Sequence, residues 1–520
     1  MVPLDSYFAT NLRGKHTPSL SAILNVVAQN LFGHSTRTWC NANLRSYKLF
    51  WEEMMTEGGR TPSTRDTKLH HNFPTDLRTA RQSIQIEPDV VKYAACPACC
   101  NIYPPKKSGK VMEWPTECVW RRFPHSQPCG EPLVKSAIEG GESVRVPICP
   151  FEVQDFDSFI GRLLCRPGYE KILDEGTVFS LQPDELTDIK DGSAIHDMKG
   201  PDGKPFLDGF KRNELRLAWS LSVDWFNPFH NKQAGKSASC GSIAMLLLNL
   251  PLSLRNKPEN VYINAVAPKE PNVNQVDHYL DPLVHMMERN YQHGTHFTST
   301  HDNPREGRSS RSMITVQVFD LPGVKKVLGH CSFRSNHNFC SHCTLSKADI
   351  GNFDWQHWPL RKREDLRAAA EAWRDAPSAA DRKALYNQNG VRWSSLWGLS
   401  YFDPTRSVVV DGMHNIFEGL VQYHCRTVLG IDTPDPEPTE EKAADPLKIS
   451  SAINLFAQGT TCNTLEQFAI PVLKALCLHH NLALPQAGTR KPTKAQILDV
   501  LERSRVSRVT GLVFISLTIS

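Results

Sequence analysis

The sequence predicts a protein of several domains that combines α-helices with β-strands. Its length of 520 residues exceeds that of an ordinary single domain and allows a large buried core. Segments 217–224 and 313–320 alternate apolar and polar residues with the period of a half-buried strand, and each ends in aspartate. Apolar residues in 273–291 follow helical spacing instead, so we expect an α+β or α/β multi-domain architecture.

Changes in composition divide the chain into seven segments. Cysteine and proline mark a compact module, glycine and proline mark turns, and a Pro/Glu/Asp-rich stretch marks a linker. The segments are a mixed helical region (1–90), a zinc-ribbon-like module (91–135), a helical and loop connector (136–212), an ordered core (213–430) with a helical insert (355–397), an acidic linker (431–450), a small helical pair (451–506) and a tail (507–520).

The order of elements in the core is typical of one fold. Three apolar strands come first, the first ending at Asp224, and a helix over 273–291 follows them. A fourth strand ends at Asp320, and after further helices a short strand at 407–410 leads into a last helix. Strand, strand, strand, helix, strand, helix, strand, helix is the order of an RNase H-like core, which we therefore expect here.

Carboxylates at the ends of neighbouring strands are candidate ligands for a divalent cation. Asp224 and Asp320 each end a strand, and two such carboxylates are the minimum that holds Mg²⁺ for phosphoryl transfer. Asp411, His414 and Glu418 have the i, i+3, i+7 spacing of one helix face, so Asp411 or Glu418 is a candidate third carboxylate. Alternatively, Asp411 only caps the helix and Glu418 faces solvent.

Four cysteines in the module 91–135 have the spacing of a zinc ribbon. Cys96 and Cys99 form a Cys-x-x-Cys pair, and Cys118 and Cys129 follow at the distance expected for the second pair of ligands. We expect structural Zn²⁺ here, because the segment is too poor in apolar residues to fold alone. Neighbouring Cys100 and His125 compete as ligands, and the alternative is a set of buried free thiols.

A second Cys-x-x-Cys pair follows Asp320 by twenty residues. Cys340 and Cys343 cannot close a zinc site by themselves, so further ligands must come from elsewhere in the chain. His414 and His424 are the best candidates by residue type. The alternative is two ordinary cysteines in a turn.

A basic turn lies between two helical segments near the end of the chain. Its cations Arg490, Lys491 and Lys494 could contact phosphates, as in a SAP-type DNA-binding motif. The net charge of the whole chain is only +4, so any nucleic-acid surface must be local.

Composition also predicts the compartment. The N-terminal residues carry no signal-peptide hydrophobic region, and no apolar run is long enough to span a bilayer. Fifteen cysteines without a secretory signal favour a reduced, intracellular protein whose cysteines partly bind metal.

Several of these residues together resemble the Tnp2-like transposases of CACTA-type (En/Spm-like) DNA transposons. The resemblance covers roughly residues 85–430. Its motifs are Cys96-Pro-Ala-Cys99, Asp224-Trp-Phe-Asn227-Pro228, Leu248-Asn249-Leu250-Pro251, Phe319-Asp320-Leu-Pro322-Gly323, Phe339-Cys340-Ser-His-Cys343 and Asp411-Gly-Met413-His414-Asn415.

The resemblance implies a DDE/D-type catalytic core that cuts and joins DNA strands with two Mg²⁺ or Mn²⁺ ions. Asp224 and Asp320 match the first two acids, and Cys340, Cys343 and His414 match features that accompany the core. It further implies a nuclear protein that binds double-stranded DNA at transposon ends, as a homo-oligomer if active and without membrane association.

The C-terminal part departs from that family. The third acid of such enzymes is usually a glutamate on a final helix, and only about ninety residues follow Leu429 here. The tail 507–520 is unlike the charged helices before it, so we expect a C-terminal truncation. Either Asp411 or Glu418 is then the third ligand, or the protein is an inactive relic that acts as a zinc-stabilised DNA-binding or interaction protein.

Overall fold

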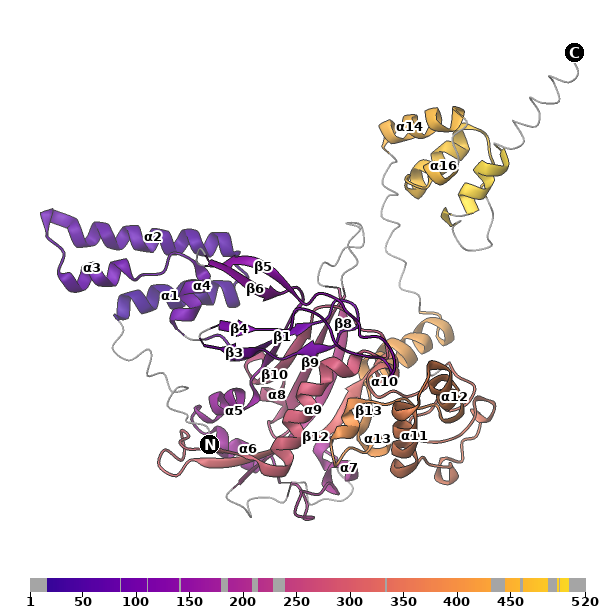
Figure 1. Ribbon diagram of the computed structural model, residues 1–520, viewed down its shortest axis with the longest axis horizontal. Helices are drawn as coiled ribbons and strands as arrows, with labels where there is room; N and C mark the ends of the chain where they lie inside the picture. Colours follow the sequence, from indigo (N-terminus) through magenta and orange to yellow (C-terminus); the bar gives the residue numbers. More distant parts are fainter. Residues whose placement is uncertain are drawn as a thin grey trace, which may run out of the picture. The chain divides into compact units, whose positions relative to one another are not determined.

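The structure is a computed structural model that divides into two compact units, Met1–Asn415 and Ile416–Ser520, each considered by itself below. Elements are labelled as in Figure 1. The residues described are 16–84, 86–109, 111–139, 142–178, 186–207, 214–227, 239–332, 334–431, 445–458, 462–484, 493–494 and 496–504.

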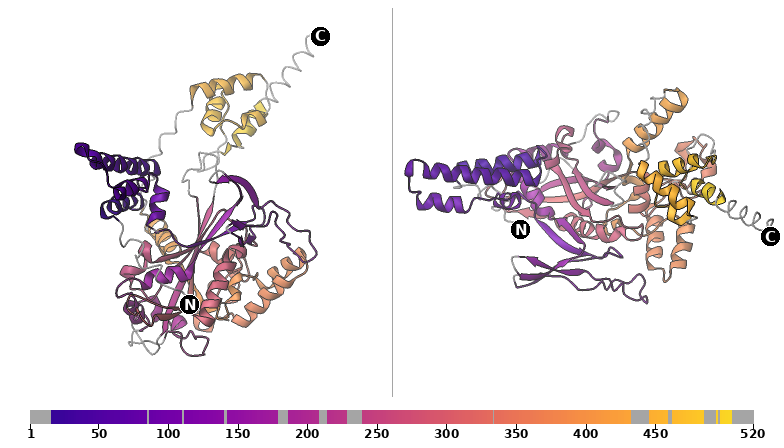
Figure 2. Two further views of the ribbon diagram at one scale, coloured as in Figure 1. Left: turned by 60° about the vertical axis from the view of Figure 1, so that its left-hand side comes forward. Right: turned by 90° about the horizontal axis from the view of Figure 1, so that it is seen from above.

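The first unit begins with a helical part in which α1 and α2 lie side by side (Figures 1 and 2). Thr36, Ser63 and Asp76 cap three of the helices, each accepting a backbone N–H in the first turn. Val26, Cys40 and Leu44 are buried in a separate small core of this part. The elements are α1 (Thr17–Leu31), α2 (Arg37–Thr56), η3 (Glu57–Gly59), α3 (Thr64–His71) and α4 (Leu77–Ser83).

A curled, mixed sheet of nine strands forms the centre of the unit, which confirms the prediction of a mixed α/β protein. Its order is β11-β12-β8-β9-β10-β7-β1-β2; β11 pairs with the first residues of β12, and β13 pairs with its last three. All neighbours are antiparallel except β8–β12 and β12–β13, which are parallel. The strands are β1 (Val90–Ala95), β2 (Ile102–Tyr103), β7 (Pro150–Gln154), β8 (Glu214–Phe226), β9 (Cys240–Leu247), β10 (Val261–Ala267), β11 (Thr295–Phe297), β12 (Arg308–Phe319) and β13 (Val408–Val410).

The connector 136–212 contains strands, which the prediction of helices and loops missed. A hairpin joins β5 (Val134–Glu139) to β6 (Glu142–Pro147), and Phe151 lies in β7. Strand β7 has only five residues, so its period-2 pattern merges with the helical pattern of the next segment. A second small hairpin joins β3 (Lys106–Ser108) to β4 (Val111–Glu113).

Helices cover both faces of the sheet. On one face Phe156 and Phe159 of α5 pack edge-on against Tyr262 of β10, and α9 supplies Tyr279 and Leu283. The other face carries a smaller cluster that includes Ile195, Phe206, Ala218 and Met313. The elements are α5 (Phe156–Leu164), α6 (Tyr169–Glu175), η4 (Ile189–Asp191), α7 (Ser193–His196), α8 (Leu252–Arg255), η6 (Pro258–Asn260), α9 (Val276–His293) and α10 (Leu321–Val327).

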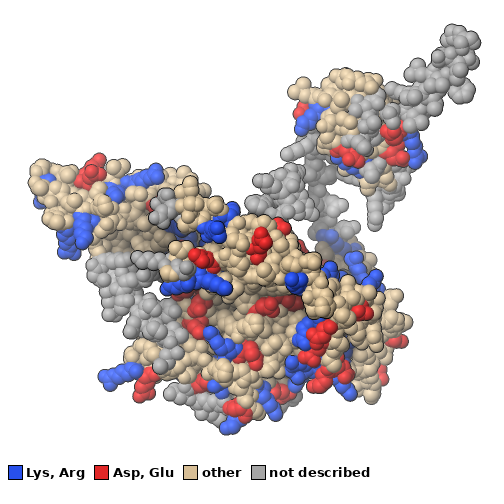
Figure 3. Space-filling view, in the orientation of Figure 1, with Lys and Arg blue, Asp and Glu red and all other residues tan. Residues whose placement is uncertain are grey.

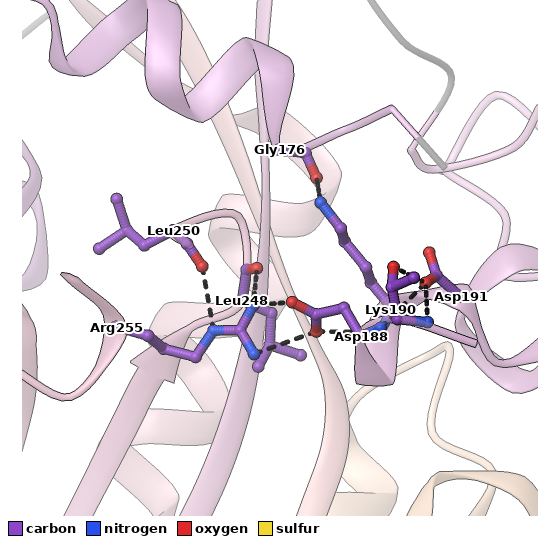
Figure 4. Close-up of polar contacts among 8 residues, drawn as sticks. Gly176, Asp188, Lys190, Asp191, Leu248, Leu250 and Arg255 are labelled. Carbon is purple, nitrogen blue, oxygen red and sulfur yellow. Dashed lines mark hydrogen bonds and ion pairs between the residues drawn. The ribbon is translucent and has the colours of Figure 1, made fainter. Parts of the chain in front are cut away.

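A buried ion pair fixes the connector to the sheet (Figure 4). The Arg255 guanidinium donates to both carboxylate oxygens of Asp188, at 3.1 and 2.7 Å, and to the carbonyls of Leu248 and Leu250. Lys190 donates to the carbonyl of Gly176 at 3.2 Å. Separating Arg255 from Asp188 would leave a buried charge without its partner, which is strongly unfavourable. The contact therefore holds residues 186–191 against the sheet.

The helical insert lies between α10 and β13. It spans more of the chain than the predicted 355–397, because the turns before it and the segment up to Ser407 belong to the same packed region. Leu366, Leu396 and Trp397 join it to the main core. Its elements are η7 (Lys347–Asp349), η8 (Trp355–His357), α11 (Arg363–Asp375), α12 (Ala379–Asn389), η9 (Ser395–Gly398) and α13 (Pro404–Ser407).

The second unit contains a small helical core with buried Phe456, Leu473, Leu476, Ile497 and Leu501. The predicted linker 431–450 is too long at its C-terminal end, since Asp445 caps a helix that begins at Pro446. The tail 507–520 lies outside the described residues. The helices are α14 (Pro446–Ala457), α15 (Cys462–Leu465) and α16 (Ile470–His479); the π-helices η10 (Met413–Val421) and η11 (His424–Val428) precede them.

Charges of both signs are interspersed over the molecular face in Figure 3. This agrees with the net charge of only +4. Among the helices that the structure describes, none combines the length and apolar character that a membrane span requires.

Candidate functional site

The four cysteines predicted to bind zinc come together. The sulfurs of Cys96, Cys99, Cys118 and Cys129 all lie within 4.8 Å of one another. The Cys96–Cys129 and Cys99–Cys118 sulfur pairs are 3.7 and 3.5 Å apart. In the described part of the chain, this is the only set of three or more His, Cys, Asp or Glu side chains with that spacing. Neither of the competing candidates, Cys100 and His125, belongs to it.

Local backbone structure brings the four sulfurs together. Cys96 directly follows β1, and its sulfur accepts the backbone N–H of Cys99 at 3.5 Å, as expected for a tight metal-binding turn. Cys118 and Cys129 lie on two segments joined by a backbone hydrogen bond from Gly130 to the Cys118 carbonyl at 2.8 Å. Gly130 has φ 71°, a conformation that a residue with Cβ adopts only under strain.

The chemistry of this cluster fits a structural metal. Three of the four cysteines are buried, and burial raises the pKa of the Cys99 thiol far above its ordinary value, with the neighbouring Cys118 adding to the effect. Bound Zn²⁺ would stabilise the thiolates that burial otherwise disfavours. Four sulfur ligands suit tetrahedral Zn²⁺, so the cluster can hold a metal such as zinc.

Sequence analysis missed a residue that supports the cluster. The Tyr103 hydroxyl lies 3.2 Å from the Cys118 sulfur and accepts the backbone N–H groups of Val119 and Trp120 at 2.9 and 3.1 Å. Such contacts orient a metal ligand and adjust its basicity. The only signal in the sequence was an aromatic residue four positions after the Cys-x-x-Cys pair.

The cysteine cluster packs against the start of α9. The carbonyl of Pro97 accepts from the Lys269 ammonium, and the carbonyl of Ala98 accepts from the Gln275 amide at 3.2 Å. The rings of Trp120 and His278 meet edge-on with centroids 5.2 Å apart. Since β1 also pairs with β7, the predicted module is part of the central sheet and not a separate domain.

The three candidate aspartates lie at the carboxyl ends of three adjacent parallel strands. The last β8–β12 pair is Leu221 with Gln317, and the same register continued three residues along each strand would bring Asp224 opposite Asp320. The last β12–β13 pair is Phe319 with Val410, and one further position would bring Asp320 opposite Asp411. We call this row the acidic edge.

Strand alternation places the three carboxylates of the acidic edge on the same face of the sheet. Ala218 of β8, Val318 of β12 and Val409 of β13 all belong to the cluster on the face opposite α5. Counting in steps of two from each of them reaches Asp224, Asp320 and Asp411.

Each carboxylate makes a local hydrogen bond. The Asp224 carboxylate accepts the backbone N–H of Trp225 at 2.8 Å. Asp320 caps α10, accepting the N–H of Gly323 at 2.6 Å. Asp411 accepts the N–H of Met413 at 3.0 Å and contacts His414 Nδ1, and the bond with His414 lowers the pKa of Asp411. Their oxygens do not all lie within 4.8 Å of one another.

The expected alignment of Asp411, His414 and Glu418 on one helix face is wrong for Glu418. Residues Met413–Val421 form a π-helix, whose bonds span five residues, so the i, i+7 spacing of an α-helix does not apply. Glu418 is exposed and belongs to the second unit. Asp411 and His414 are in contact.

The second Cys-x-x-Cys pair forms the same tight turn without gathering further ligands. The Cys340 sulfur accepts the backbone N–H groups of His342 and Cys343, both at 3.4 Å. The Arg361 guanidinium, which sequence analysis missed, donates to the carbonyls of Cys340 and Cys343 at 2.9 and 3.1 Å.

The predicted partners of that pair are His414 and His424. His414 contacts Asp411, and His424 lies in the second unit. In the part of the chain that the structure describes, Cys340 and Cys343 belong to no set of three close metal-ligating side chains. Metal binding at this pair stays a prediction.

Of the three cations predicted to contact DNA, Arg490 and Lys491 lie outside the described residues. The Lys494 ammonium donates to the carbonyl of Glu466. This bond joins two segments of the small helical unit, which gives Lys494 a structural contact.

Comparison with known proteins assigns no family. No protein-family model and no curated protein matches this chain. The function proposed below therefore rests on the residues and contacts of this molecule.

Proposed function

We propose that the chain is a metal-dependent DNA strand-transfer protein related to the transposases of CACTA-type transposons. The observation that carries this proposal is the acidic edge: Asp224, Asp320 and Asp411 lie at the carboxyl ends of adjacent parallel strands, and strand alternation places them on one face of the sheet. A row of carboxylates in this position suits Mg²⁺ or Mn²⁺, which prefer oxygen ligands.

The topology supports an RNase H-like core as the basis of this activity. Three antiparallel strands, β8, β9 and β10, are followed in the chain by α9, then β12, α10 and β13. In the sheet they lie in the order β10-β9-β8-β12-β13, with β8, β12 and β13 parallel.

Asp320 lies on the middle strand of the three and is next to both of the other carboxylates in register. Two divalent cations bound there would lower the pKa of the attacking water or 3′-hydroxyl and stabilise the leaving oxygen. The three aspartates would hold these cations. The Asp411–His414 contact would keep that carboxylate ionised and oriented.

A nicking assay on supercoiled DNA with Mn²⁺ tests the proposal. We expect Asp224→Asn and Asp320→Asn to reduce nicking by at least a hundredfold, since each removes a metal-ligating charge. Asparagine keeps a side-chain acceptor, so the cap of α10 at position 320 survives. Nicking at the wild-type rate by folded Asp224→Asn protein would rule the proposal out.

Asp411→Asn and Glu418→Gln identify the third carboxylate. The register predicts that Asp411→Asn abolishes nicking and that Glu418→Gln does not. The opposite result would assign the role to Glu418.

A second candidate function is zinc-stabilised DNA binding without catalysis, in the nucleus. One observation favours it: the four cysteine sulfurs converge, whereas the three carboxylates do not lie within the same distance of one another. It predicts DNA binding that is unaffected by Mg²⁺ and by Asp224→Asn, and no nicking by the zinc-loaded wild type.

A further inference from the structure

Five cations from distant parts of the sequence line one pocket of about 320 Å³. It lies where the four-cysteine module, α10 and the helical insert meet. No lining residue carries a carboxylate. The cations are Arg122, Lys325, Arg382, Lys383 and Arg392.

The protein itself does not neutralise this charge by direct pairing. Among the described ion pairs, none includes any of the five cations; the nearby Asp375 is paired with Arg374. Burial and, to a smaller extent, the charge of Arg122 lower the pKa of Arg382, while the charge of Asp375 raises it. An anion in the pocket would relieve the repulsion between the two arginines.

Arg382 also has an unused hydrogen-bond donor. Its Nε is buried and has no acceptor within the described protein, while one terminal nitrogen donates to the carbonyl of Arg374 at 2.8 Å. A buried donor without a partner is unfavourable by about 1–3 kcal/mol. An oxygen of a bound ligand could satisfy it.

Aromatic rings hold the Arg382 side chain in place. Its guanidinium carbon lies 4.6 Å from the ring centre of Phe123 and 4.7 Å from that of Trp373. Holding a guanidinium between two rings restricts its motion before any ligand binds, so less entropy is lost on binding.

Arg392 fixes the base of the pocket. This buried guanidinium donates to the carbonyls of Val273 and Lys325, which ties the loop before α9 to the end of α10. Lys383 is exposed and Lys325 is half-buried. The rigid arginines and these longer, mobile lysines together can surround an anion.

We propose that this pocket binds a phosphate group. A phosphate offers several oxygens and up to two negative charges, and the fork of an arginine matches its geometry. The phosphate could belong to a nucleic-acid backbone or to a free phosphate compound. Lys325 is five residues after Asp320 on α10, about 8 Å along the helix axis, so a strand bound at the acidic edge could reach the pocket.

Binding of two probes to the full-length protein tests the proposal: a fluorescein-labelled single-stranded oligonucleotide and inorganic pyrophosphate. We expect Lys383→Gln to weaken binding about threefold and Arg122→Gln/Lys383→Gln about tenfold, with a salt-dependence slope lower by about one per cation. Lys347→Gln, at an exposed lysine elsewhere in the insert, is the matched control and should bind normally.

The outcomes separate the phosphate sources. If the pocket variants bind both probes more weakly, the pocket is a general phosphate site. If they bind only the oligonucleotide more weakly, it is a nucleic-acid site. If they bind only pyrophosphate more weakly, it is a site for a free phosphate compound. Unchanged binding of both probes by folded double variant would overturn the proposal. Equal affinity for a poly-glutamate peptide, lost in the same variants, would also overturn it.

The test is independent of catalysis. The assay measures binding and not strand cleavage, and no residue that lines the pocket belongs to the acidic edge. A protein that never nicks DNA but loses probe binding in the pocket variants would refute the proposed activity and leave the pocket assignment standing.

Discussion

Cys96-Pro-Ala-Cys99 and Cys340-Ser-His-Cys343 have the same spacing and form similar turns, in which the first sulfur accepts backbone N–H groups. Around the first turn, two further cysteines complete a set of four sulfurs. Around the second, the Arg361 guanidinium donates to the carbonyls of the turn. The Cys-x-x-Cys turn therefore forms from local sequence alone, whereas a metal site also requires that the tertiary structure bring a second pair of ligands close to it.

The largest effect should follow from removing one sulfur of the first set. We expect Cys118→Ser to lower bound zinc from about one ion per chain to near zero and to expose residues 96–129 to proteolysis, because zinc ligation supplies the folding energy of such segments. Metal analysis after gel filtration and limited proteolysis measure both. Cys100→Ser, at a cysteine next to the cluster but outside it, should keep the metal. If Cys118→Ser retained its zinc, the four sulfurs would not be the metal site that distinguishes the first turn from the second.

A smaller effect should follow at the second turn, where an arginine replaces the metal as the organising cation. Arg361→Ala should destabilise the protein by about 2–3 kcal/mol, with or without chelator, because it removes charged hydrogen bonds to two carbonyls. Urea unfolding measures the change. Arg361→Lys should recover only part of it, since an ammonium lacks the planar fork.

Cys340→Ser tests whether the second turn, unlike the first, lacks bound metal. If the second turn is organised by Arg361 alone, this variant keeps its full zinc content. Loss of a second zinc equivalent would show instead that Cys340 and Cys343 bind metal, with His414 or His424 as partners.

The last effect depends on pH and concerns Asp277, on α9 beside His278, which touches the first cysteine region through Trp120. Burial raises the pKa of Asp277 to about 7, although its carboxylate accepts the Ser395 N–H at 2.8 Å. In the unfolded chain this group ionises near pH 4. Its stabilising contribution is therefore complete below about pH 4 and is lost as the pH rises through 7.

We expect the wild type to lose about 3–4 kcal/mol of stability relative to Asp277→Asn between pH 4 and pH 8. The asparagine retains an acceptor for Ser395 and does not titrate. Unfolding midpoints of both proteins across this range give the difference. Parallel stability curves would show that the carboxyl stays ionised in the folded protein.

The sequence predicted those features that depend on spacing alone. The four-cysteine set followed from the intervals between its members, and β8 and β12 from period-2 alternation that ends in aspartate. Mixed α/β architecture followed from the same patterns. Residue spacing and alternation are local properties of the sequence, so they can be recognised without knowing the tertiary structure.

Features set by tertiary contacts were not predictable. Arg361 is one arginine among many, and only the fold brings it beneath Cys340 and Cys343. The π-helix after Asp411 shifts every later side chain relative to α-helical spacing, which removed Glu418 from the expected face. The hairpin β5–β6 was missed because its alternating residues are partly charged and exposed.

The sheet register has a consequence for the order in which the molecule folds. Strand β13 has three residues, and about ninety residues separate it from its parallel partner β12. Closing a loop of that length costs about 4 kcal/mol of chain entropy, which three residue pairs cannot offset. Docking of β13 therefore waits until the intervening helices have folded and shortened the loop, so Asp411 reaches its place after Asp224 and Asp320. Refolding followed by time-resolved hydrogen exchange should protect β8 and β12 before β13.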